Sequence, residues 1–210
     1  MAQVDNPHTN VALFNAHNNT IAQLLDTDEI DNQRTETPNM TAQNANLPKE
    51  KQTNLGLYLT AKEAYEKWKA GAAKVTILDV RTPEEYLFVG HPTMAWKIPV
   101  AAQSYEWDAG KEQFPMTLLA DFVARVQRVA KPDDTILVMC RSGGRSAIAV
   151  NLLAKAGFKN VYNIVDGMEG DVVERPDSVF HGQRLVNGWK NAGCPWTYKL
   201  TPDRMLLLEQ

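Results

Sequence analysis

Short apolar runs alternate with longer stretches of mixed apolar and polar residues over most of the chain. Three runs are rich in β-branched residues and have the length of strands that are buried on both faces of a parallel sheet. These predicted strands are residues 75–80, 135–139 and 161–165, and a further short strand could lie within residues 94–100. Asp166-Gly167 is typical of the turn that ends the last of them.

The stretches between these runs repeat their apolar residues at the spacing of amphipathic helices. Thr60 and Glu63 match the Thr-x-x-Glu capping box, which predicts that a helix begins there. Thr82 followed by Pro83 predicts a second helix directly after the first strand. Two further helices are predicted over residues 117–130 and 146–156. The alternation of strands and helices indicates an α/β fold, in which helices cover both faces of a mainly parallel sheet.

The N-terminal 56 residues differ from the rest of the chain. They hold seven acidic and three basic residues, are rich in Asn, Thr, Gln and Asp, and contain few apolar residues. Such a segment buries too little apolar surface to offset the entropy lost on ordering it. We therefore predict an extended or partly disordered polar arm over residues 1–56 and a folded domain over residues 57–210. Residues 11–25 could form a short helix that docks on a second copy, which would make the protein a homo-oligomer.

Length, composition and charge exclude several classes of protein. The chain has 210 residues, of which 44% are hydrophobic and 22% charged, as expected for one globular domain and a tail. No run approaches the ~20 apolar residues of a membrane-spanning helix, and the net charge of −3 gives no basic excess for binding nucleic acid. The two cysteines, Cys140 and Cys194, are too few for a disulfide framework and lack the spacing of a zinc site.

The compartment follows from the first twenty residues. They contain no Lys or Arg and no long apolar stretch, unlike a secretory leader. As written, the chain is expected in the cytoplasm. The alternative is the periplasm, if a leader has been removed.

The most informative segment is Met139-Cys140-Arg141-Ser142-Gly143-Gly144-Arg145-Ser146, which lies between a predicted strand and a predicted helix. Open parallel sheets bind ligands beyond the carboxyl ends of their strands, and a helix N-terminus presents unpaired amides with a partial positive charge. Gly143 and Gly144 permit a tight curl of the backbone around a ligand. These amides and the two arginines favour a thiolate, so Cys140 is a candidate nucleophile in an anion-binding loop. The alternative is a buried structural cysteine before a glycine-rich connection.

Several motifs, in this order, resemble the rhodanese sulfurtransferase family over residues 57–196. The motifs are Asp79-Val80-Arg81, Pro83-Glu84-Glu85-Tyr86, Gly90-His91, Ile98-Pro99, the loop from Cys140 to Ser146, Gly157-Phe158, Val161-Tyr162 and Asp166-Gly167-Met168. The resemblance implies a rhodanese-like fold, with a mainly parallel five-stranded sheet and helices on both faces. It also implies that Cys140 accepts a sulfane sulfur from thiosulfate or a similar donor, becomes a persulfide, and passes the outer sulfur to cyanide or another thiophilic acceptor.

The resemblance further implies roles for the residues around Cys140. Arg141 and Arg145 would hold the sulfonate of the donor, and the loop amides would stabilise the persulfide without a metal or an organic cofactor. Gly143 and Gly144 would let the backbone approach the donor. Hydroxyl groups could also bind the sulfonate, from Ser142 and Ser146, although Ser146 could equally cap the following helix. Asp79 and Arg81 would frame the site as an ion pair that ties two loops together.

Two other functions stay open. A phosphatase branch shares this fold and a similar loop, but cysteine-dependent phosphatases place their arginine one residue further from the cysteine than Arg145 lies from Cys140. The shorter loop favours sulfur over phosphatase or arsenate-reductase chemistry. The other alternative is a non-enzymatic sulfur carrier or regulatory module of the same family, because a dedicated relay could also retain Cys140.

Two segments, residues 101–116 and 170–188, look like insertions. The second separates Gly167 from Trp189, although in the family a tryptophan usually follows this glycine within a few residues. Either insertion could form a lid or a docking surface, so the natural donor and acceptor stay undetermined.

Other reactive side chains are assigned simpler roles. Cys194 would resolve a persulfide on Cys140 only if the fold brought the two sulfur atoms together. His91 and His181 are expected in turns or at the surface, because neither has a second ligand at metal-binding spacing.

Overall fold

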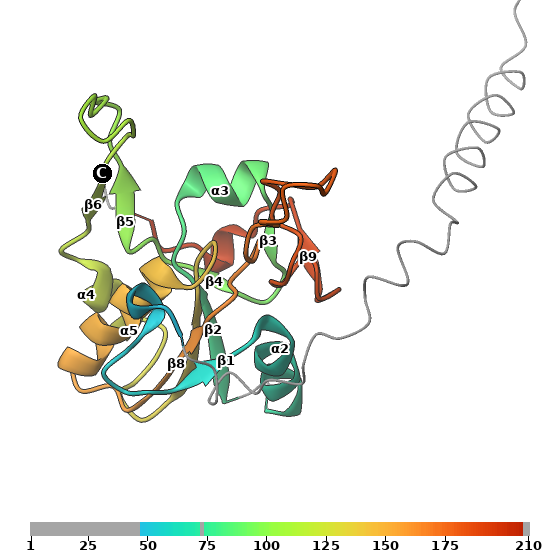
Figure 1. Cartoon of the computed structure of the whole chain (residues 1–210). Coiled ribbons are helices and arrows are strands. Elements are labelled where there is room, and N and C mark those ends of the chain that lie inside the picture. The colour runs from blue at the N-terminus through green and yellow to red at the C-terminus, as the bar shows by residue number, and fades with distance from the viewer. Residues whose placement is uncertain (1–46, 72–73, 208–210) are drawn as a thin grey trace, which may run out of the picture. The chain divides into compact units, whose positions relative to one another are not determined.

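Five parallel strands form the central sheet of the computed structural model, which describes residues 47–71 and 74–207 (Figure 1). Their order across the sheet is β1-β8-β7-β2-β4. The strands are β1 (Tyr58–Leu59), β2 (Val75–Asp79), β4 (Trp96–Lys97), β7 (Thr135–Met139) and β8 (Asn160–Ile164). The mainly parallel five-stranded sheet is thus confirmed. Of these five strands, β1 alone was not predicted. Its two residues extend the sheet by pairing with Asn163 and Ile164 of β8.

The helices follow the predicted order along the chain. They are α2 (Ala61–Ala70), α3 (Pro83–Phe88), α4 (Phe122–Gln127) and α5 (Gly144–Lys155), with short 3-10 helices η2 (Lys49–Lys51) and η3 (Pro202–Arg204). The capping box of α2 is confirmed, because the Thr60 amide donates to the Glu63 carboxylate and the Glu63 amide donates to the Thr60 hydroxyl.

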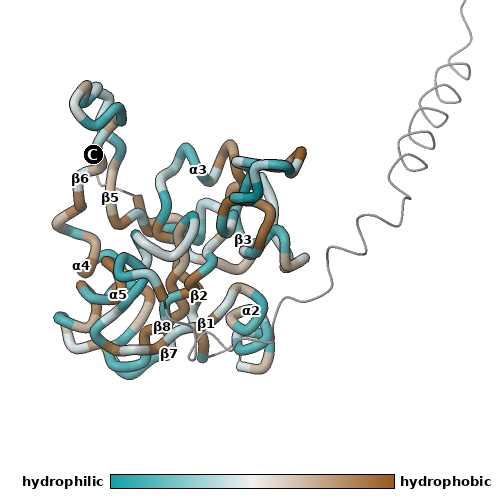
Figure 2. The backbone as a smooth tube through the Cα atoms, viewed as in Figure 1, coloured by the Kyte–Doolittle hydropathy of each residue, from teal (hydrophilic) through white to brown (hydrophobic). Residues whose placement is uncertain are grey.

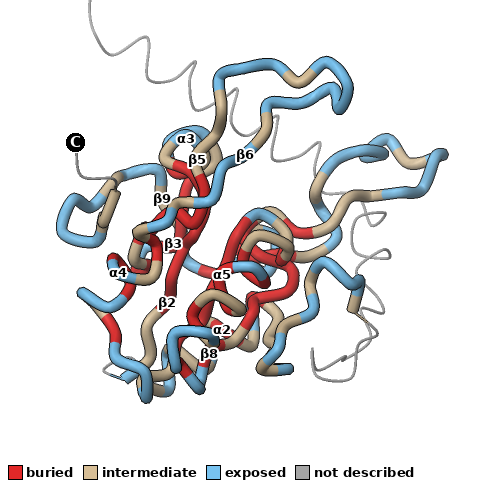
Figure 3. Tube along the Cα trace, turned by 90° about the vertical axis from the view of Figure 1, so that its left-hand side faces the viewer, coloured by how far each residue is buried: buried red, intermediate tan, exposed pale blue. Residues whose placement is uncertain are grey.

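Alternate residues of the central strands face two separate cores. Leu78 and Val138 pack with α4 and α5 on one face, while Ile77 and Leu137 pack with α2 and Trp189 on the other. Figure 2 shows apolar residues along the strands, and Figure 3 shows that these central segments are buried. Helices on both faces explain why apolar residues face both sides of the central strands instead of alternating with polar residues.

The predicted helix over residues 117–130 is wrong at its start. Residues 116–118 form strand β6 (Met116–Leu118), which pairs antiparallel with β5 (Ala101–Gln103) in a hairpin. The apolar side chains of Met116 and Leu118 are exposed on this hairpin, and the buried stripe begins only at Phe122. A second small antiparallel pair joins β3 (His91–Pro92) to β9 (Trp196–Thr197).

Residues 47–56, which the sequence pattern assigned to the arm, pack against the folded unit. The Asn54 amide donates to the side chain of Asn151 on α5, and Leu55 packs against the core on the α5 face of the sheet. The folded unit therefore extends at least to η2 (Lys49–Lys51). The rest of the predicted arm, including residues 11–25, lies outside the described residues.

The segment 170–188 leaves the domain and returns to the same point. Gly170 and Gly188 touch at its base, where a Cβ atom on Gly188 would lie 2.5 Å from the Gly170 amide nitrogen. The returning chain places Trp189 beside Gly167, and the Trp189 amide donates to the Gly167 carbonyl at 2.8 Å. Trp189 thus enters the core next to this glycine despite their separation in sequence.

In the described part of the chain, no helix combines the length and the hydropathy needed to cross a membrane.

Candidate active site

Cys140 lies at the carboxyl end of the sheet. It follows Met139, the last residue of β7, which pairs with Asp79 at the end of β2. Helix α5 begins four residues later, so Cys140 stands between a strand end and a helix N-terminus. The residue is 2% exposed. This is the position at which parallel α/β sheets bind ligands.

The backbone of Gly143 turns its amide toward the sulfur. The Gly143 N–H donates to Cys140 Sγ at 3.2 Å, and Gly143 has φ of +102°. A side chain at this position is excluded by space as well as by conformation, because a Cβ atom would lie 2.3 Å from the carbonyl oxygen of Val165. The close approach of Gly143 to Val165 therefore sets the shape of the loop.

The first turn of α5 begins with amides that have no partner within the helix, and these lie next to this loop. The Ala147 amide donates to the Gly143 carbonyl, and the amides of residues 144–146 precede that first backbone bond. Gly143 is the N-cap, so the proposal that Ser146 caps the helix is wrong. The Ser146 hydroxyl instead lies 3.4 Å from Cys140 Sγ and donates to Asn163 Oδ1 at 2.6 Å.

The two arginines of the loop have different surroundings. Arg145 donates two hydrogen bonds of 2.6 Å to the carboxylate of Glu85 on α3. Burial would raise the pKa of Glu85, but the hydrogen bonds and the charge of Arg145 outweigh burial and lower that pKa. Arg141 is exposed, and its guanidinium has no ion-pair partner among the described residues. Of the two arginines, Arg145 is therefore held by an ion pair and Arg141 is exposed to solvent.

Asp79 and Arg81 form a buried ion pair at the ends of the loops beside β2. Arg81 donates to both carboxylate oxygens of Asp79, at 2.8 and 2.6 Å, and to the Gly90 carbonyl at 2.7 Å. Both side chains are fully buried. The Tyr86 hydroxyl lies within hydrogen-bonding distance of the Asp79 and Arg81 carbonyls. The pair thus ties the strand end to α3 and β3.

A family model for the rhodanese-like domain matches residues 60–172. The chain belongs to the rhodanese-like domain family. "Uncharacterized protein RP600" of Rickettsia prowazekii is 34% identical over 122 residues, which cover 58% of this chain and 82% of that protein. "Thiosulfate sulfurtransferase 16, chloroplastic" of Arabidopsis thaliana is 39% identical over 90 residues, which cover 43% of this chain and 68% of that protein.

Among solved structures, this rhodanese-like domain is similar to Rv0390 from M. tuberculosis. The TM-score is 0.50 at 25% sequence identity, and the match covers 67% of this chain and 96% of the other. The similarity supports the fold that the strand order shows.

Two residues that sequence patterns did not indicate as functional, Asn163 and Glu85, form hydrogen bonds that hold the loop from Cys140 to Ser146. Asn163 on β8 is fully buried and donates to the carbonyls of Gly143 and Lys51, at 3.0 and 2.9 Å. Its one sequence signal is a polar residue within an apolar strand. Glu85 accepts from the Thr82 amide in the capping box of α3 and is also the partner of Arg145.

The loop also rests on the turn after β8. The Met168 amide donates to the Cys140 carbonyl at 2.8 Å, and the Glu169 amide donates to the Arg141 carbonyl at 3.0 Å. The Asp166 carboxylate accepts from the amides of Ala61 and Gly188. Burial raises the pKa of Asp166 to about 6.

Cys194 does not share the site of Cys140. Cys140 belongs to the core on the α5 face of the sheet, whereas Cys194 belongs to the core on the α2 face. Burial raises the pKa of the Cys194 thiol to about 11. The sheet therefore separates the two sulfur atoms, and Cys194 is not placed to resolve a persulfide.

His91 is fully buried, so its predicted turn or surface position is wrong. It lies in β3, where the pairing with β9 covers it, and its Nδ1 is 3.1 Å from the Pro92 carbonyl. Burial lowers the pKa of His91. His181 is exposed in a turn, as predicted.

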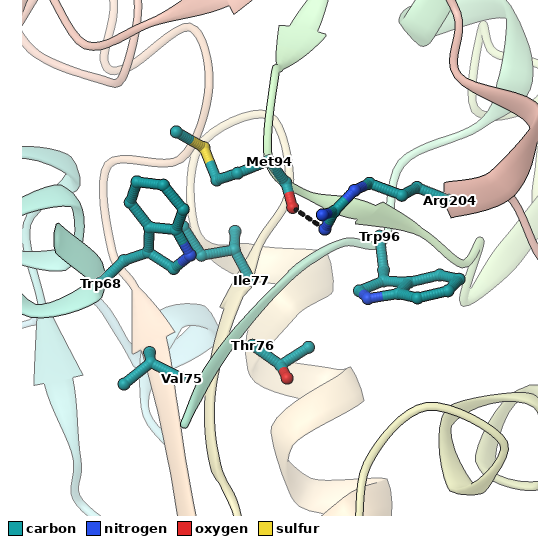
Figure 4. Close-up of a pocket in the computed structure, with 7 residues that line it drawn as sticks. All are labelled: Trp68, Val75, Thr76, Ile77, Met94, Trp96 and Arg204. Carbon is teal, nitrogen blue, oxygen red and sulfur yellow. Dashed lines mark hydrogen bonds between the residues drawn. The ribbon is translucent and has the colours of Figure 1, made fainter. Parts of the chain in front are cut away.

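A cavity of about 140 Å³ has no residue of the Cys140 loop among its lining residues (Figure 4). Its wall includes the first three residues of β2, whereas Cys140 lies beyond the last residue of the neighbouring strand. The lining residues are Trp68, Val75, Thr76, Ile77, Met94, Trp96 and Arg204. Among the described residues, no group of three or more His, Cys, Asp and Glu side chains is placed to hold a metal ion.

Proposed function

We propose that this rhodanese-like domain is a sulfurtransferase that carries sulfane sulfur from thiosulfate, or a similar donor, on Cys140. The observation that carries the proposal is the contact of the Gly143 amide with Cys140 Sγ at the N-terminus of α5. Backbone amides and the end of a helix stabilise a sulfur anion and the anionic donor that approaches it. The name of the Arabidopsis relative, a thiosulfate sulfurtransferase, supports the same reaction.

The reaction has two steps, as in ping-pong kinetics. The Cys140 thiolate attacks the outer sulfur of thiosulfate, the sulfur–sulfur bond of the donor breaks, and sulfite leaves with the bonding electrons. Cys140 then carries a persulfide. Cyanide or another thiophilic acceptor attacks the outer sulfur of this persulfide, which gives thiocyanate and restores the thiolate. Neither step requires a redox partner.

The loop residues divide the work of binding the donor. Arg141 is exposed and unpaired among the described residues, so it would meet the sulfonate first. Arg145 is held by Glu85 but keeps further N–H groups for the donor. The amides of Gly143 and Gly144 and the hydroxyl of Ser142 would complete the anion site, whereas the Ser146 hydroxyl donates its one proton to Asn163. Asp79 and Arg81 would hold its frame.

The first prediction concerns the sulfur carrier. After treatment with thiosulfate, the intact wild-type protein should gain the mass of one sulfur atom on Cys140 and convert cyanide to thiocyanate. Cys140→Ser should lose both properties, because the hydroxyl cannot form a persulfide. Cys194→Ser is the matched control and should keep both. Mass spectrometry and a thiocyanate assay provide the measurements.

The same experiment separates the alternatives. A sulfur carrier would form the persulfide but release little thiocyanate. Hydrolysis of a phosphate ester without any sulfur adduct would overturn the proposal in favour of a phosphatase.

A further inference from the structure

We propose that Asn163 is a positioning residue that fixes the Cys140 loop in the geometry needed for sulfur transfer. The inference rests on the proposed function, because it assumes that Cys140 is the sulfur carrier. Asn163 does not contact the sulfur itself. It acts through Gly143 and Ser146, whose amide nitrogen and hydroxyl oxygen lie 3.2 and 3.4 Å from Cys140 Sγ.

Each polar group of the Asn163 amide has a partner. Oδ1 accepts from the Ser146 hydroxyl at 2.6 Å, and Nδ2 donates to the Gly143 carbonyl at 3.0 Å and to the Lys51 carbonyl at 2.9 Å. A fully buried amide with this many bonds has one orientation, because each alternative would leave a buried polar group unpaired. Asn163 therefore imposes its own orientation on the loop.

Gly143 and Ser146 connect the Asn163 amide to the sulfur of Cys140. The Gly143 carbonyl belongs to the peptide unit whose N–H is that of Gly144, so holding this carbonyl also directs the first amide of α5. The Ser146 hydroxyl is held 3.4 Å from Cys140 Sγ by its bond to Asn163. Without Asn163, the loop would keep Gly143 in its left-handed conformation but lose the bonds that fix its rotation against β8.

The third hydrogen bond of Asn163 connects it to residues 47–56, through Lys51. The backbone of Lys51 accepts from Asn163, while its side chain lies over Gly143 and donates to Asp171 at 2.8 Å. The Lys51 side chain is only 12% exposed. Asn163 therefore joins the loop to η2 and, through Lys51, to the base of the segment 170–188.

The test uses Asn163→Asp in the full chain. This change keeps the shape of the side chain but replaces the donor Nδ2 by an oxygen, which would face the carbonyl oxygens of Gly143 and Lys51. The matched control is Asn160→Asp, the same change on an exposed residue of β8. Two quantities are measured: the rate at which iodoacetamide alkylates Cys140, and the kcat and KM for thiosulfate with cyanide as acceptor.

We expect Asn163→Asp to lower kcat and the alkylation rate by about tenfold or more, as the loss of buried hydrogen bonds would. KM for thiosulfate should change less than kcat does, because Arg141 and Arg145, which bind the sulfonate, are untouched. General unfolding would instead expose both Cys140 and Cys194 and raise the alkylation rates of both. Burial raises the pKa of the Cys194 thiol to about 11, so this thiol reacts slowly in the folded protein and its alkylation identifies unfolded molecules.

Asn163→Ser provides a second, smaller change if the aspartate variant fails to fold. Its hydroxyl can donate only one hydrogen bond, so an intermediate loss of kcat is expected. The inference is overturned if a folded Asn163 variant matches Asn160→Asp in kcat and in alkylation rate. If the wild-type protein transfers no sulfur, the proposed function fails, whereas the alkylation rates still test the position of the loop.

Discussion

At the scale of the residue, the site depends on one glycine. Gly143 has φ of +102°, contacts Cys140 Sγ through its amide, and leaves no space for a side chain against Val165. Gly144 is its neighbour but begins α5, and a Cβ atom there would lie 3.9 Å from its nearest neighbouring atom. Two adjacent glycines therefore serve different purposes, one for conformation and one for the helix start.

Alanine substitutions should separate the two glycines. Gly143→Ala should destabilise the domain by about 3 kcal/mol or more, because it combines a left-handed backbone with a clash against Val165. Gly144→Ala should leave stability unchanged or raise it by ~0.5–1 kcal/mol, since alanine favours a helix over glycine. Urea unfolding, monitored by circular dichroism, measures the free energy of unfolding of both variants. Equal stabilities for the two variants would contradict the account of the loop.

Residues of the site could be predicted where they are adjacent in sequence. Cys140, Gly143 and Arg145 stand in one short loop, and their residue types and spacing are enough to suggest an anion site. Asn163 and Glu85 could not be found this way, because they lie 20 residues from Gly143 and 60 residues from Arg145. Only the fold of the sheet brings them to the loop.

At the scale of the element, α3 and α5 are joined by the ion pair of Glu85 and Arg145. Each side chain is about four-fifths buried, at 19% and 20% exposure. The carboxylate of Glu85 also accepts from the Thr82 amide and so anchors the start of α3. The position of Arg145 over the loop therefore depends on a helix that is distant in sequence.

The ion pair makes stability depend on pH. Because the folded protein lowers the pKa of Glu85, its stabilising effect is present above the unfolded value of about 4.3 and is lost as the pH falls through the folded value. At pH 7, Glu85→Gln should cost about 1.5–3 kcal/mol, the range for hydrogen bonds to charged groups. The difference from wild type should shrink below about pH 4.

Unfolding by urea at several pH values tests this prediction. Glu84→Gln is the control, because Glu84 is exposed on the same helix and should show little difference at any pH. A Glu85→Gln deficit that stays constant from neutral to acidic pH would assign the loss to packing instead of charge.

The elements themselves show where apolar patterns are sufficient. The strand at 135–139 was predicted with its bounds because burial on both faces leaves a continuous apolar run. The segment 117–130 was assigned wrongly in part because the exposed hairpin strand β6 also contains apolar residues, Met116 and Leu118. Helical spacing alone cannot tell an exposed apolar side chain from a buried one.

At the scale of the whole molecule, the folded unit includes a polar segment that composition assigned to the arm. Residues 47–56 supply little apolar surface, but they contribute a backbone acceptor for Asn163, an amide donor for Asn151 and an ion pair with Asp171. Specific hydrogen bonds, which composition does not reveal, hold this segment on α5 and β8. Polar composition therefore placed the domain boundary too far along the chain.

Chains that start at residue 47 and at residue 57 should differ in stability and in reactivity. Without residues 47–56, the domain loses the packing of Leu55 and the bonds to Asn151 and Asn163, together worth about 3 kcal/mol. The shorter chain should therefore melt at a lower temperature, and its Cys140 should be alkylated at a different rate because Lys51 no longer covers Gly143. Calorimetry measures the melting temperature, and mass spectrometry measures the alkylation rate. The control is Asn54→Ala in the longer chain, because it removes only a side chain and keeps the hydrogen bond from the backbone amide of residue 54 to the Asn151 side chain. Equal melting temperatures for the two chains would show that the segment adds nothing to the folded unit.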